Sequence, residues 1–111
     1  MTVTETFFSV EVGDMQRATA FYVDALGATV VFASAGWSSL RIAGVRLGLA
    51  LSREHAAVRV GLHFAVSDLA AARADVERAG GAAAAPIEVA PGVVVAEATD
   101  TEGNTFALAQ R

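Results

Sequence analysis

Bulky apolar side chains recur at every second position in several short segments of the chain, which is the period of a β-strand. In residues 4–12, Phe8, Val10 and Val12 would face one side of a sheet, and the residues between them would face the other. The same alternation predicts further strands at residues 28–34, 37–42, 45–51, 58–66, 93–99 and 105–110, and a weaker strand at 82–89 that Pro86 interrupts.

Two other segments carry their apolar residues at helical spacing. Between residues 15 and 26 the apolar side chains recur at intervals of three and four. Asp14 has a side chain suited to capping the start of this helix, and Gly27 is suited to the left-handed conformation that ends one. A second helix is predicted from Asp68 to Ala79. The predicted element order is therefore strand, helix and three strands, twice.

The two halves of the chain also match each other in sequence, 54 positions apart. The polar turn at Asp14 recurs at Asp68, and the glycine that ends the first helix, Gly27, recurs as Gly81. A duplicated unit indicates one architecture made of two similar parts, and ligand sites tend to form where such parts meet. We therefore expect an α+β fold in a single domain over residues 1–111, with one βαβββ module at 1–52 and a second at 58–111.

Each strand has one side suited to packing under a helix and another side of mixed character. The mixed side combines small, aromatic and charged residues, whereas a plain solvent face would carry more charge and a core face none. This composition indicates a curved mixed sheet around a cavity, with the helices on the outer face. The residues expected to face the cavity are Phe7, Ser9, Glu11, Trp37, Ser39, Arg41, Arg46, Gly48, Ala50, Gly61, His63 and Ala107.

Composition excludes several kinds of chemistry. The chain has no cysteine, which removes disulfides and thiolate sites, and no lysine, which removes Schiff-base catalysis. Its net charge of −4 without a basic cluster argues against a nucleic-acid partner. No apolar run is long enough to cross a membrane, and the amino-terminal residues lack a basic leader, so we expect a cytoplasmic protein. The abundance of alanine and arginine suggests a bacterial genome of high GC content.

Two motifs point to a family. Residues 12–27 read V-G-D-x-x-R-A-x-x-F-Y-V-D-A-L-G, and residues 100–108 read D-T-E-G-N-T-F-A-L, with Thr101 where proline is usual. With the doubled βαβββ order, these segments resemble the vicinal oxygen chelate superfamily, which includes glyoxalase I, bleomycin-resistance proteins and extradiol dioxygenases. The resemblance covers nearly the whole chain. It implies a homodimer, in which the cavity can include strands from both subunits.

The resemblance also implies where a metal would be held, and this chain departs from the pattern there. Members that use a metal have one ligand on each of four strands. Three of those positions are Phe7, Gly61 and Ala107, and the strand at 45–51 contains no Glu, Gln, His or Asp. Because these side chains offer no nitrogen or oxygen ligand, we expect no family-type metal site and no cofactor.

His63 and Glu11 could still act chemically. His63 has a pKa range suited to general acid–base work, but a strand histidine can also be purely structural. Glu11 has two interpretations. It is either a general base, or an acceptor for a hydroxyl group or cation of a ligand, or else it is a rim residue paired with Arg41 or Arg46. A replacement metal site of Glu11, His63 and Glu97 would have at most three ligands.

The other predicted site residues each have two interpretations. Trp37 and Phe7 would offer flat apolar surface to an aromatic ligand, or they fill space between the halves. Arg41 and Arg46 would clamp a carboxylate or phosphate, or they are solvated arginines at a strand edge. His55, in the linker between the modules, is expected to be exposed.

Three functional hypotheses follow. The first is a metal-free protein that binds and sequesters an apolar or aromatic metabolite or antibiotic, as the resemblance to bleomycin-resistance proteins implies. The second is a metal-independent isomerase, cyclase or lyase that uses His63 and Glu11 as acid and base. The third is an interaction module whose cavity has collapsed.

Overall fold

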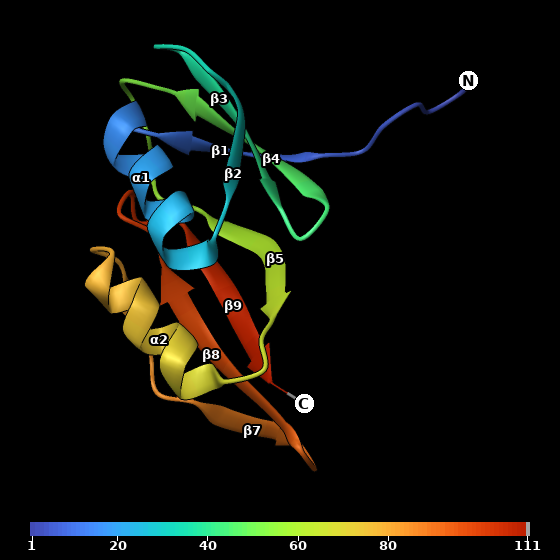
Figure 1. Cartoon of the computed structure of the whole chain (residues 1–111), viewed down its shortest axis with the longest axis vertical. Helices are drawn as coiled ribbons and strands as arrows, with labels where there is room; N and C mark the ends of the chain where they lie inside the picture. The colour runs from blue at the N-terminus through green and yellow to red at the C-terminus, as the bar shows by residue number, and fades with distance from the viewer. Residues whose placement is uncertain (111) are drawn as a thin grey trace.

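Each half of the chain folds as a strand, a helix and a set of further strands, and the two halves lie one beyond the other (Figure 1). The computed structural model describes residues 1–110, so Arg111, the last residue of the second predicted module, lies outside the described part. The two helices pack against each other on one flank of the molecule (Figure 1). The doubled βαβββ order predicted from the sequence is confirmed.

The first module forms a four-stranded mixed sheet, sheet A. Its strand order is β1-β4-β3-β2, in which β1 is parallel to β4 and the other neighbours are antiparallel. The parallel pair is possible because helix α1 makes the crossover between the strands. The elements are β1 (Phe8–Val12), α1 (Met15–Leu26), β2 (Thr29–Ala33), β3 (Trp37–Ile42) and β4 (Val45–Leu51).

The second module repeats this plan in sheet B. Its order is β5-β9-β8-β6, with β5 parallel to β9, and β7 pairs separately with β8. The two sheets share no ladder, so the mixed sheet expected from the sequence is built as two separate sheets. The elements are β5 (Arg59–Ala65), α2 (Leu69–Arg78), β6 (Ala82–Ala83), β7 (Ile87–Ala90), β8 (Val93–Thr99) and β9 (Thr105–Gln110).

Two element boundaries differ from the sequence prediction. The first strand begins at Phe8 instead of Thr4. Since Phe8 lies opposite Leu47, the residues before Thr6 extend beyond the first residue of β4 and have no strand beside them. The weak strand at 82–89 is divided into β6 and β7, because Pro86 has no backbone N–H to donate to a ladder.

The hydrophobic core lies between the sheets and the two helices. On sheet A, Val12, Leu40 and Leu49 are fully buried, as predicted for the helix-facing side. Phe21 of α1 packs against Phe106 of β9 with the two rings tilted and 6.3 Å between their centroids. This contact joins the cores of the two modules. The whole core forms one cluster. No helix in residues 1–110 is long and apolar enough to cross a membrane.

Asp100 organises the turn between β8 and β9 and connects it to the first module. Its carboxylate accepts hydrogen bonds from the backbone N–H groups of Glu102 and Asn104. The Tyr22 hydroxyl of α1 donates to the same carboxylate over 2.6 Å. Burial, together with the Asp100 charge, raises the pKa of Tyr22, so its hydroxyl remains a donor. The amide of Asn104 donates to the backbone oxygen of Glu11.

Glu102 connects the same turn to the start of α1. Its side chain is fully buried and accepts from the backbone N–H groups of Gly13 and Asp14 and from the guanidinium of Arg17. Thr101, at the position where proline is usual, adds a hydroxyl donor at 2.9 Å. Burial alone would raise the pKa of Glu102, but these hydrogen bonds outweigh it and lower the pKa to about 2.

His55 belongs to the same connection, contrary to the expectation that it is exposed. Its Nε2 atom lies 2.5 Å from the backbone oxygen of Glu102, and the residue is partly buried. The linker between the modules therefore packs onto the turn of residues 100–104.

We predict that Glu102→Gln lowers the free energy of unfolding at pH 7 by roughly 2–4 kcal/mol, because the guanidinium of Arg17 and the backbone N–H groups of Gly13 and Asp14 would lose a charged acceptor that is itself buried. The folded-state pKa lies below the ordinary value of 4.5. The contribution of Glu102 is therefore complete above about pH 4.5 and is lost as the pH falls toward 2. Urea denaturation at pH 7 and pH 3 measures both effects, and the difference between variant and wild type should shrink at pH 3. The exposed Glu54→Gln is the control, and equal midpoints for both variants at pH 7 would contradict the prediction.

Candidate functional site

The face of sheet A that points away from α1 carries most of the residues predicted to line a cavity. The strand register places them in rows across β1, β4 and β3. In one row Ser9 lies beside Gly48, which lies beside Ser39, and in the next Ala50 lies between Glu11 and Trp37. The alternation of side chains therefore places these predicted residues on one surface, as the sequence indicated.

Trp37 lies flat on this surface because Gly48 leaves room for it. A Cβ atom added at Gly48 would come within 2.2 Å of two carbon atoms of the Trp37 ring. Phe7 approaches the indole edge-on, with 6.4 Å between ring centroids, an arrangement that aromatic pairs favour. Phe7 is 43% exposed. These two rings form an accessible aromatic platform.

Arg46 completes this platform. Its guanidinium carbon stands 4.4 Å above the centre of the Phe7 ring, within the range of a cation–π interaction. One of its terminal nitrogens forms an ion pair with Glu5, whereas one of the two interpretations of Glu11 had paired that residue with Arg41 or Arg46. Arg41 lies directly opposite Arg46 in the ladder of β3 and β4, and it donates to the backbone oxygen of Gly44 over 3.4 Å.

Two polar atoms on this face are buried without a hydrogen-bond partner. They are Oγ of Ser39 and Nε of Arg46. Ser39 as a residue is only 4% exposed. Most buried polar groups in proteins have a partner, so these two atoms mark a place where the face of sheet A offers unused donors.

The matching face of sheet B carries the remaining predicted residues. His63 lies beside Ala107, which in turn lies beside Glu97, across β5, β9 and β8. Glu97, whose side of the sheet was ambiguous from the sequence, is thus on the side of His63. It pairs with Arg59, and this hydrogen bond lowers the pKa of Glu97.

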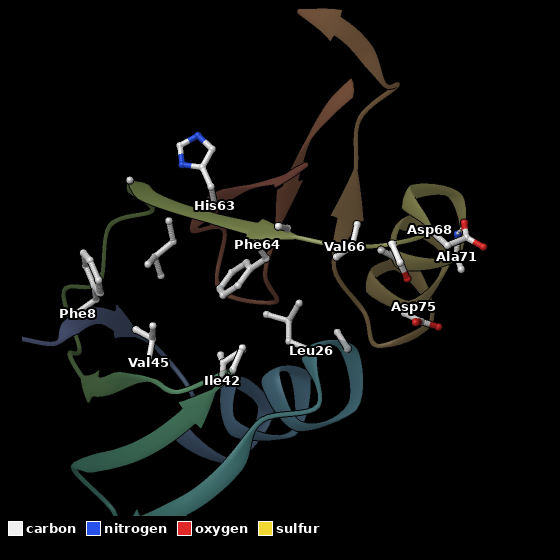
Figure 2. A pocket seen from close by; sticks show the side chains of 17 residues that line it. Phe8, Leu26, Ile42, Val45, His63, Phe64, Val66, Asp68, Ala71 and Asp75 are labelled. Carbon is white, nitrogen blue, oxygen red and sulfur yellow. Dashed lines mark hydrogen bonds between the residues drawn. The ribbon is translucent and has the colours of Figure 1, made fainter. Parts of the chain in front are cut away.

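A cleft of about 790 Å³ lies between the modules, on the opposite side of β5 from the His63 ring. Figure 2 shows the side chains of Leu26, Ile42 and Phe64 directed into it, whereas His63 points away. Phe8, not Phe7, contributes to its wall. Gly61 and His63 of the predicted set border the cleft along β5, but Phe7, Trp37 and Arg46 do not line it.

The structure brings together some of the predicted site residues and separates others. Phe7, Trp37 and Arg46 are in contact. Glu11 and His63, the predicted acid–base pair, are on sheets that share no ladder. Within residues 1–110, no three His, Asp or Glu side chains are grouped so as to hold a metal ion. The sequence analysis missed Glu5, because its role depends on where the residues before β1 lie.

A family model described as a glyoxalase-like domain matches residues 7–109 of the chain. No curated protein matches the sequence detectably. A glyoxalase/bleomycin resistance protein from Catenulispora acidiphila is 27% identical with a TM-score of 0.75, and the match covers 98% of this chain and 99% of that one. The antibiotic-binding protein TnmS3 from Streptomyces sp. is 25% identical with a TM-score of 0.73, covering 99% and 98% of the two chains.

The fosfomycin resistance protein FosX from Mesorhizobium loti has the same fold. It is 16% identical, its TM-score is 0.80, and the match covers 100% of this chain and 94% of that one. Together with the family model, these similarities support the vicinal oxygen chelate superfamily that the two sequence motifs indicated.

We predict that Gly48→Ala displaces the Trp37 ring, because the new methyl group cannot share its space. Overpacking of this kind costs roughly 1–3 kcal/mol of stability. Trp37 is the only tryptophan of the chain, so a change in its emission spectrum and in acrylamide quenching reports the displacement. Gly61→Ala is the matched control, since a Cβ there meets nothing within 4 Å. Identical spectra for the two variants would show that the ring does not rest on Gly48.

Proposed function

We propose that this chain, which belongs to the glyoxalase-like domain family of the vicinal oxygen chelate superfamily, binds a small apolar or aromatic molecule without a metal ion. The observation that carries this proposal is the aromatic platform on the open face of sheet A, formed by the exposed Phe7 ring and the partly buried Trp37 ring. Aromatic side chains at a surface bind flat apolar ligands through dispersion and burial of apolar surface. The antibiotic-binding name of TnmS3 supports an antibiotic or related metabolite as the ligand.

The proposal of a metal-free site rests on which side chains occupy the positions where the family resemblance implies metal ligands. The positions that correspond to metal ligands in related proteins hold Phe7, Gly61 and Ala107. Phe7 instead packs edge-on against Trp37, and the Arg46 guanidinium lies over the face of the Phe7 ring. A divalent metal requires nitrogen or oxygen ligands at these places. These residues do not fit a family-type metal centre.

We further propose that the protein acts as a homodimer. The chain exposes 6534 Å², whereas a compact monomer of 11.4 kDa exposes about 5,800 Å². The extended residues before β1 contribute part of the difference. Exposed apolar side chains on the edge strands contribute to the remaining excess of surface area. They are Val30, Val31, Phe32, Ile87 and Val89. Exposed apolar edge strands are usually covered, and a second copy would cover them.

The alternative function is a metal-independent isomerase, cyclase or lyase with His63 and Glu11 as acid and base. These residues belong to sheets that share no ladder, so this reaction would require the two sheets to bring them together, within one chain or between two copies. His63→Ala distinguishes the two functions, because it would abolish turnover by such an enzyme and would change binding to the platform only modestly. A bacterial cytoplasmic location remains part of the proposal.

We predict that Trp37→Ala weakens binding of the neutral fluorescent probe N-phenyl-1-naphthylamine at least about fivefold, because the flat ring that the probe stacks on is removed. Phe8→Ala is the matched control, since Phe8 is as exposed as Phe7 of the platform but faces the cleft on the other side of β1. Probe fluorescence in a titration gives both dissociation constants. If Phe8→Ala weakens binding and Trp37→Ala does not, the ligand occupies the cleft and the proposed site is wrong.

Native mass spectrometry of untagged protein, never exposed to a chelator, tests the metal-free dimer. We expect twice the chain mass of 11.4 kDa, with a small organic molecule retained and without a stoichiometric divalent metal. Bound metal in equal ratio to the chain would contradict the proposal and would direct attention to Glu11, His63 and Glu97.

A further inference from the structure

We infer that the ligand is a planar aromatic acid, whose carboxylate takes the place beside Arg46 that Glu5 holds in the free chain. This inference rests on the proposed binding function and names the chemical class of its ligand. The ligand ring would stack on Trp37 and meet the nearly perpendicular Phe7 ring at its edge, and the acid group would meet the arginines beside that platform. Three separate features of sheet A support it.

The first feature is an excess of positive charge. Arg41 and Arg46 are direct neighbours in the ladder of β3 and β4, and like charges directly opposite each other are unfavourable. Glu5 forms the ion pair with Arg46, while the Arg41 guanidinium contacts a backbone oxygen. Glu11 lies four residues along β1 from Phe7, about 13 Å away. A ligand carboxylate that contacts both arginines would therefore be more favourable there than Glu5, which pairs with Arg46.

The second feature is the pair of unused donors. Oγ of Ser39 and Nε of Arg46 are buried without partners. Ser39 is on β3 two residues before Arg41, and its ladder neighbour Gly48 is on β4 two residues after Arg46. The hydroxyl and the guanidinium are thus diagonal neighbours on one face. Carboxylate oxygens accept from both kinds of donor.

The third feature is the position of Glu5 itself. It lies in the extended segment before β1, which no ladder holds, and its side chain is 50% exposed. Exposed ion pairs of this kind contribute little to stability. The Glu5 carboxylate is therefore a weakly held occupant that a ligand of the same charge can displace. The chain thus carries its own competitor for the anion site, next to an aromatic platform.

The test compares 4-nitrobenzoate with 4-nitrobenzamide, which has nearly the same shape and no charge. Quenching of Trp37 fluorescence reports binding at the platform, because the chain has a single tryptophan. Free tryptophan titrated in parallel corrects for absorption by the probes. We expect wild-type protein to bind the acid at least fivefold more tightly than the amide.

Charge-neutral variants then locate the anion site. Glu5→Gln should tighten 4-nitrobenzoate binding threefold or more and leave the amide unchanged, because the internal competitor is gone. Arg46→Gln should remove the preference for the acid. Asp75→Asn is the matched control: Asp75 also pairs with an exposed arginine, Arg78 on α2, but it lies outside the platform, so both affinities should stay as in wild type.

Each outcome separates this inference from the proposed function. Equal affinities for acid and amide would overturn the inference and leave aromatic binding intact. An unchanged acid affinity in Glu5→Gln would show that Glu5 does not compete, which also overturns it. If neither probe quenches Trp37 at millimolar concentration, the binding function itself fails.

Discussion

The buried carboxylate of Glu102 is the contact on which the arrangement of the two modules depends. It accepts hydrogen bonds from the backbone of the two residues that precede α1 and from the side chain of Arg17, although it belongs to the turn before β9. A buried carboxylate is costly to desolvate, and several donors must be held in place to offset that cost. The turn of residues 100–104, the linker at His55 and helix α1 therefore form a single polar connection.

The side chains of this connection are not those of the Phe7, Trp37 and Arg46 platform. The motif residues of the chain are largely used in the connection: Arg17, Tyr22, Asp100 and Asn104 all contact the turn or bridge it to the first module. Their role here is structural. The residues that differ from the metal-binding pattern, such as Phe7, are on the other side of the sheet, where they can change without disturbing the connection. This separation gives a physical reason why one scaffold can carry different ligand sites.

Much of the fold could be predicted because its signals are local. The bounds of β3, β4, β8 and β9 agree with the predicted segments, and Asp14 caps the first helix as expected. Asp68, predicted as the first residue of the second helix, is its cap. Strand alternation also placed Trp37, Ser39 and Arg46 on one face. The partner of Arg46 could not be predicted, because Glu5 is 41 residues away in sequence and precedes any regular element.

The sequence by itself determined the element order, the side of each strand that faces the helices and the lack of suitable ligands at the family's metal positions. These follow from periodicity and from residue type, which act between near neighbours. Only the tertiary structure decided that Glu102 holds the modules together, that Gly48 makes room for Trp37, and that His63 and Glu11 lie on different sheets. The contact of Gly48 with Trp37 depends on how β3 and β4 pair, and the other two facts depend on how segments far apart in the chain are brought together.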